Sequence, residues 1–125
     1  FFGEPTDKQR EVYETVRRAN EAAQRVVAPG VRFCDLDAAA RTVIQEAGYG
    51  PYFTHRLGHQ IGLDVHEPGD VSAVHDAPVQ PGMTFSIEPG IYLPGEFGVR
   101  IEDVTIITEE GCEDITGSPK NLIII

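Results

Sequence analysis

The segment Gly58-His59-Gln60-Ile61-Gly62-Leu63-Asp64-Val65-His66-Glu67 is the most informative part of this 125-residue chain. It holds two imidazoles seven residues apart, and His55 lies four residues before His59. Its glycines disfavour the helix that a His-Glu-x-x-His zinc site requires. Gly58 and Gly62 instead allow the backbone to approach a bulky or charged group closely. A lone His in such a segment is more often a structural residue than a ligand, so both roles stay open for His59.

Two later segments supply carboxylates that could join these imidazoles. Glu88 follows an alternating strand pattern and precedes the break at Pro89-Gly90, so its side chain is expected to point into a cleft. Glu102 lies in an apolar segment, where a carboxylate needs a cation that Arg100, on the same face, could provide. The plain alternatives are a solvent-facing Glu88 and an exposed Arg100–Glu102 pair. One imidazole and two carboxylates as possible ligands indicate metal-assisted hydrolysis.

The first third of the chain predicts two helices. Thr6-Asp7-Lys8-Gln9 has the form of a capping box, and apolar residues then recur every three or four positions until Pro29-Gly30. A second helix is expected to begin near Cys34-Asp35 and to stop at Gly48. Residues 50–82 are rich in Gly, Pro, His and Asp, which is typical of functional loops over short strands.

Strand periodicity dominates the remainder. Period two puts Arg100, Glu102 and Val104 on one face of the longest candidate strand. Two helices followed by mainly antiparallel strands predict the α+β class. The candidate strands are 83–88, 91–93 and 99–108, with a final hairpin of 112–115 and 122–125.

Composition limits the class of partner and the compartment. A hydrophobic fraction of 41% is ordinary for one globular domain, and no apolar run has the length of a membrane span. The net charge of −10 argues against nucleic acid or an anionic membrane as a partner. A solvated acidic surface explains this charge more simply than carboxylates awaiting cations. Cys34 and Cys112 form no Cys-x-x-Cys pair, so a reducing cytoplasm is expected.

These motifs resemble the signature of the pita-bread metallopeptidases. The resemblance rests on three segments: residues 58–67, Glu88-Pro89-Gly90-Ile91-Tyr92 and Val99-Arg100-Ile101-Glu102-Asp103. The resemblance is greatest to the proline-specific branch, prolidase and aminopeptidase P, because Leu63-Asp64-Val65-His66-Glu67 is a trait of that branch. Methionine aminopeptidase is more distant. The similarity extends along essentially the whole chain, from residue 2 to residue 123.

The resemblance implies a site in which two Asp, one His and two Glu hold two divalent metal ions. His59 would be the His ligand, Glu88 a ligand that also serves as general base, and Glu102 the carboxylate that bridges both metals. Oxygen-rich coordination favours Mn²⁺, with Co²⁺ or Zn²⁺ as alternatives.

The resemblance also implies roles around the metals. His66 would hydrogen-bond the substrate carbonyl and help to transfer protons, His55 would contact the substrate, and Arg100 would organise the site. The substrate would be a proline-containing peptide, cleaved before proline, and the enzyme a homo-oligomer.

The two Asp ligands of the family lie upstream of the residues that match this chain. Asp35 and Asp37 do precede His59, but their position at a predicted helix start is explained by capping. Residues 1–125 are therefore interpreted as the C-terminal half of a pita-bread catalytic domain. Alone, this part is expected to be inactive, to hold at most one ion weakly and to self-associate through uncovered apolar surface.

Two other functions fit the same fold. One is a non-catalytic pita-bread module that binds peptide or protein, and the other is a metal-free hydrolase of the creatinase type, which acts on a small guanidino compound. The presence of His59, Glu88 and Glu102 together disfavours both.

Overall fold

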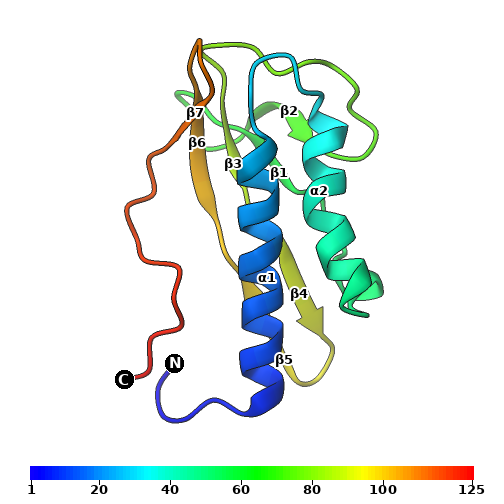
Figure 1. Ribbon diagram of the computed structural model, residues 1–125, viewed down its shortest axis with the longest axis vertical. Coiled ribbons are helices and arrows are strands. Elements are labelled where there is room, and N and C mark those ends of the chain that lie inside the picture. Colours follow the sequence, from blue (N-terminus) through cyan, green and yellow to red (C-terminus); the bar gives the residue numbers. More distant parts are fainter.

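The computed structural model describes residues 1–125 and contains two helices packed on one face of an antiparallel sheet (Figure 1). The helices are α1 (Asp7–Val26) and α2 (Phe33–Glu46), followed by a 3₁₀ turn, η1 (Gly50–Tyr52). The strands are β1 (Gly58–Gln60), β2 (Glu67–Val71), β3 (Thr84–Ile87), β4 (Gly90–Leu93), β5 (Phe97–Arg100), β6 (Asp103–Ile107) and β7 (Cys112–Asp114). The predicted α+β class is confirmed.

Both predicted helices are confirmed, and local sequence explains their ends. Thr6 and Gln9 form the capping box: the Gln9 amide donates to Thr6 Oγ1 at 3.2 Å, and the Thr6 amide donates to Gln9 Oε1 at 2.8 Å. The α2 helix begins at Phe33, slightly earlier than predicted, and Gly48 follows its end with a φ of 86°. The apolar face of α1 is fully buried at Val12, Val16, Ala19 and Ala23, whereas Val26, the last residue predicted on this face, is 41% exposed at the helix end.

The strands form a five-stranded sheet in the order β2-β1-β3-β6-β7 and a separate two-stranded sheet, β4-β5. All pairs are antiparallel. Phe85 and Ile87 of β3 are fully buried in the core beneath the helices. The same strand therefore presents its remaining side chains to the opposite face of the sheet.

The prediction of one long strand over 99–108 is wrong, because the chain changes partners within it. The β3–β6 ladder ends at the pair Ile87–Asp103, and the β4–β5 ladder begins at the pair Gly90–Arg100. A break at 88–89 and 101–102 separates the two ladders, and both candidate carboxylates lie in it. Pro89 contributes to this break because it has no N–H to donate.

The predicted final hairpin is also wrong. The β7 strand pairs with β6, not with residues 122–125. The closing segment instead lies beside the N-terminus, where the Gly3 amide donates to Ile125 O at 2.9 Å and the Ile125 amide donates to Phe1 O at 2.8 Å (Figure 1). An apolar run shows that a segment needs a partner, but it does not identify that partner.

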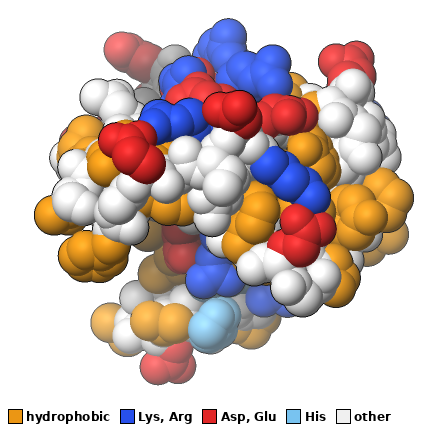
Figure 2. Space-filling view, turned by 90° about the horizontal axis from the view of Figure 1, so that it is seen from below, with side chains coloured by type: hydrophobic (Ala, Val, Ile, Leu, Met, Phe, Trp, Pro, Cys, Tyr) orange, Lys and Arg blue, Asp and Glu red, His pale blue; other side chains and the backbone are white.

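The charged surface is mixed in sign on the face that Figure 2 shows, where acidic and basic side chains lie interspersed. The net charge of −10 is therefore not gathered into one acidic patch on this face. None of the helices combines the length and the apolar character needed to cross a membrane.

Candidate metal centre

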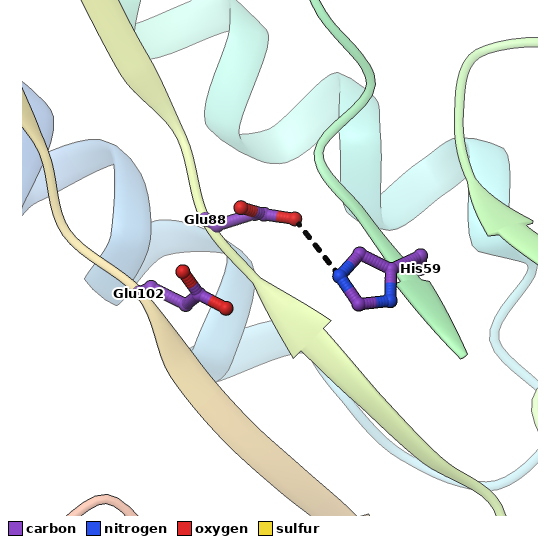
Figure 3. Close-up of side chains that lie close together, drawn as sticks. All are labelled: His59, Glu88 and Glu102. Atoms are coloured by element: carbon purple, nitrogen blue, oxygen red, sulfur yellow. Dashed lines mark ion pairs between the residues drawn. The ribbon is translucent and has the colours of Figure 1, made fainter. Parts of the chain in front are cut away.

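Three side chains from separate segments converge on one point: His59 from β1, Glu88 just after β3, and Glu102 between β5 and β6 (Figure 3). One potential ligand atom from each lies within 4.8 Å of the other two. The side chains of His59 and Glu88 are 8% and 12% exposed, whereas that of Glu102 is 41% exposed. The fold therefore brings together the three residues that were predicted as ligands from the sequence.

The ring of His59 is oriented so that one nitrogen is free to bind a cation. Its Nδ1 lies 3.0 Å from the carbonyl oxygen of Gln60. A carbonyl oxygen can only accept a hydrogen bond, so Nδ1 carries the proton of the neutral ring. In that neutral form the lone pair of Nε2 faces Glu88 Oε1 at 3.4 Å, the contact that the dashed line marks in Figure 3. An imidazole fixed through its second nitrogen in this way is the usual arrangement of a metal-ligating His.

Ser86 connects the two buried members of the group. Its hydroxyl accepts from the His59 amide at 3.0 Å and donates to Glu88 Oε1 at 3.2 Å. The Glu88 amide in turn donates to Leu57 O at 2.8 Å, and the Ile61 amide donates to Thr84 O at 3.0 Å, so this segment and β3 are held together on both sides of His59. Sequence reasoning did not assign Ser86 a role, although its position two residues before Glu88 puts both on one face of the strand.

Gly58 allows β1 to lie this close to β3. A Cβ atom at position 58 would overlap the carbonyl group of Ser86. The backbone is closely approached at Gly58, but by the backbone of the neighbouring strand and not by the bulky or charged group that was predicted. At Gly62 the predicted charged group is present, because a Cβ there would overlap the Glu67 carboxylate. The close approach at Gly58 places His59 beside the strand end that leads to Glu88, whose Oε1 lies 3.4 Å from His59 Nε2.

The three side chains fit a divalent cation. Two donors that share one ion at about 2.1 Å each lie about 3.0 to 3.4 Å apart at octahedral or tetrahedral angles. The His59 Nε2–Glu88 Oε1 distance of 3.4 Å meets this requirement, and the half-exposed Glu102 has the freedom to close the remaining gap. One nitrogen and several carboxylate oxygens form a donor set for a hard or borderline metal ion.

Arg100 lies between the two carboxylates. Its Nε is 3.6 Å from Glu88 Oε2 and 3.8 Å from Glu102 Oε2, with 51% of the side chain exposed. The positive charge offsets the repulsion between two carboxylates held close together. Arg100, Glu102 and Val104 line the same cavity, as predicted for one shared face, although they do not lie on one continuous strand.

The predicted substrate-contacting histidines also line this open cavity of about 780 Å³. The ring centroid of His66 lies 4.3 Å from that of His59, and His66 is exposed at the cavity edge. His55 packs edge-on against Tyr92 at 5.5 Å. Arg56, which sequence reasoning did not single out, lines the cavity as well and pairs with Asp70 at 3.0 Å.

The prediction that Asp35 and Asp37 cap a helix is wrong. The residue at the N-cap is Arg32, which makes no side-chain cap. Arg32 donates two hydrogen bonds to the Asp35 carboxylate at the surface. These bonds lower the pKa of the Asp35 carboxyl. Asp37 is buried, pairs with Arg41 at 2.7 Å and accepts from the Leu57 amide at 3.1 Å.

The Asp37–Arg41 pair supports the segment that leads into β1. Arg41 also donates to the carbonyl oxygens of Phe53 and His55, each at 3.0 Å. The pair therefore fixes the chain from residue 53 to residue 57, directly before Gly58 and His59. The spacing of four residues between Asp37 and Arg41 was the available sequence signal.

Replacing Arg41 with Met is expected to destabilise the protein by about 3 kcal/mol, because it leaves the Asp37 charge buried without a partner. The urea midpoint of the purified protein measures this effect. Arg32→Met is the matched control, since it breaks an exposed pair and should leave the midpoint unchanged. Equal midpoints for the two variants would show that the Asp37–Arg41 pair contributes no more than a surface pair.

The comparisons with known proteins agree with this geometry. The sequence model that describes metallopeptidase family M24 matches residues 1–109 of this chain. The chain belongs to metallopeptidase family M24. Among M24 relatives, it is 49% identical over 124 residues to the Xaa-Pro dipeptidase of Lactobacillus delbrueckii subsp. lactis, covering 99% of this chain and 34% of that protein.

Solved structures of the family show the same fold. Dipeptidase PepE from Mycobacterium ulcerans superposes with a TM-score of 0.96 at 45% identity, over 98% of this chain and 33% of that one. The prolidase from Pyrococcus furiosus superposes with a TM-score of 0.91 at 45% identity, over 94% of this chain and 35% of that one. The predicted resemblance to the prolidase branch is confirmed. The chain spans about a third of the length of these M24 relatives.

Proposed function

We propose that residues 1–125 form the C-terminal part of a pita-bread catalytic domain, and that the full-length protein hydrolyses the peptide bond preceding proline. The observation that supports this most directly is the convergence of His59, Glu88 and Glu102 within 4.8 Å in a chain of family M24. The names of its relatives, Xaa-Pro dipeptidase and prolidase, support the choice of substrate.

In this proposal His59, Glu88 and Glu102 hold divalent metal, with Mn²⁺ the expected ion and Co²⁺ or Zn²⁺ as alternatives. Bound metal supplies a Lewis acid that polarises the scissile carbonyl and makes water a better nucleophile. Two Asp from the remainder of the domain complete the ligand set. The 125-residue part alone is expected to hold at most one ion weakly and to be inactive.

The side chains of this chain then bind the peptide and handle protons. Glu88 acts as general base and removes a proton from the attacking water, since its carboxylate lies at the point where the donors converge. His66, at the cavity edge, donates a hydrogen bond to the oxygen of the scissile carbonyl. His55 contacts the substrate, and Arg100 keeps both carboxylates in place. An Xaa–Pro bond has no amide N–H, so a dedicated pocket is needed to recognise it.

The test is a hydrolysis assay of the full-length protein on Xaa-Pro dipeptides and on longer Xaa-Pro peptides. We expect cleavage before proline, loss of activity on treatment with a chelator, and recovery when Mn²⁺ is added back. Matched peptides with Ala in place of Pro are the control and should be cleaved slowly. Activity that persists without metal, or that ignores the proline, would contradict the proposal.

The uncovered surface of the 125-residue part is consistent with this assignment. The β2 and β7 strands form open edges of the five-stranded sheet. Leu63 and Val65, in the loop beside the cavity, are strongly exposed. We expect the preceding part of the domain to cover these groups in the full-length protein, and the isolated part to self-associate in its absence.

A further inference from the structure

Asn20 is a polar side chain in the fully buried core. It lies in the middle of α1 on the same face as Val16, Ala19 and Ala23, and it has no exposed surface. Asparagine is a poor residue for a helix interior, and burial of its amide is costly unless hydrogen bonds are made. An apolar residue would satisfy the requirements of packing alone, so the amide calls for another explanation.

The amide of Asn20 reaches the two backbone positions that precede the candidate carboxylates. Its Nδ2 donates to Ile87 O at 3.2 Å and to Ile101 O at 3.5 Å. Ile87 is directly followed by Glu88, and Ile101 by Glu102. One NH₂ group therefore connects the two segments that present the two carboxylates.

These segments form the break between the two ladders. Regular pairing ends at Ile87–Asp103 and begins again at Gly90–Arg100. Within the break, the Ile101 amide makes a long bond of 3.4 Å to Pro89 O. Asn20, on α1, thus links the two segments at the place where the ladder hydrogen bonds of the sheet are interrupted.

The carboxamide of Asn20 offers one hydrogen to each of these two partners. Both partners are carbonyl oxygens, which only accept, so the carboxamide must face them with its NH₂ group. Its Oδ1 is then buried without a hydrogen-bond partner. The two carbonyl contacts are therefore the hydrogen bonds by which this buried amide is held.

We infer that Asn20 is a positioning residue of the metal centre: it fixes the separation of Glu88 and Glu102 by holding the peptide groups that precede them. This inference rests on the proposed function, because it takes the two carboxylates as metal ligands. Asn20 touches neither metal nor substrate. It acts through the backbone of the two glutamates.

The experiment compares Asn20→Leu with Gln24→Leu in the full-length protein. Gln24 is the matched control because it lies one turn further along α1, and its Nε2 donates to Thr105 Oγ1 in the sheet at 3.0 Å. Thr105 does not adjoin a candidate ligand. The readouts are the Mn²⁺ dissociation constant by calorimetry, the visible absorption spectrum of the Co²⁺-loaded protein, and the melting temperature.

We expect Asn20→Leu to raise the Mn²⁺ dissociation constant about tenfold or more and to change the Co²⁺ spectrum, as disruption of the outer shell of a metal site does. Gln24→Leu should leave both unchanged, whatever its effect on melting. Unchanged Mn²⁺ affinity and Co²⁺ spectrum in Asn20→Leu would overturn the positioning role and leave the proposed function intact. Wild-type protein that binds no metal would overturn both. If Asn20→Leu does not fold, Asn20→Ala is judged by the same values.

Discussion

Replacing Glu88 with Gln in the full-length protein is expected to lower kcat for Xaa-Pro hydrolysis by about 10³-fold. Gln keeps the size of the side chain and can still accept a hydrogen bond from Ser86. It loses the charge that faces His59 at 3.4 Å, and a neutral amide neither removes a proton from water nor binds a divalent cation well.

The steady-state rate on an Xaa-Pro dipeptide measures this effect, and circular dichroism checks that the variant is folded. Glu110→Gln is the matched control, because Glu110 is exposed in a turn away from the cavity and should keep wild-type kcat. A folded Glu88→Gln protein that retains activity within a few-fold of wild type would show that Glu88 is neither base nor ligand.

Replacing Gly58 with Ala is expected to destabilise the protein by about 3 kcal/mol, at the upper end of the usual cost of overpacking. The new Cβ would overlap the Ser86 carbonyl, which is backbone and belongs to a strand paired on both sides. Relief requires β1 to move away from β3. That movement would separate His59 from Glu88, so Mn²⁺ affinity should fall together with stability.

Gly111→Ala is the control for this substitution. A Cβ at position 111 meets no atom within 4 Å, so its unfolding free energy should stay within about 0.5 kcal/mol of wild type. Urea unfolding and Mn²⁺ titration of both variants give the comparison. Wild-type stability and affinity in Gly58→Ala would mean that the close approach of β1 and β3 is not what sets the site.

The features that sequence predicts well are those that depend on neighbouring residues. The capping box at Thr6 and the apolar face of α1 are local patterns, and both are confirmed. The three candidate ligands were identifiable because each lies in a short motif: His59 between glycines, Glu88 before Pro-Gly, and Glu102 after Arg100 in an apolar segment.

The features that sequence missed depend on which distant segments meet. Nothing within 99–108 shows that the chain passes from one ladder to another at Ile101, because both parts have strand-like composition. The role of Asp37 depends on the Leu57 amide twenty residues away, and that of Asn20 on two carbonyl groups far along the chain. Buried polar residues of this kind have no local pattern that distinguishes them from surface ones.

The most direct measurement is a crystal structure of the full-length protein grown with Mn²⁺, with anomalous scattering used to locate the metal. We expect an anomalous peak that marks a Mn²⁺ ion bound by His59 Nε2 and by carboxylate oxygens of Glu88 and Glu102, at distances of about 2.0 to 2.3 Å. Strong metal peaks elsewhere, with these three side chains unliganded at saturating Mn²⁺, would contradict the account.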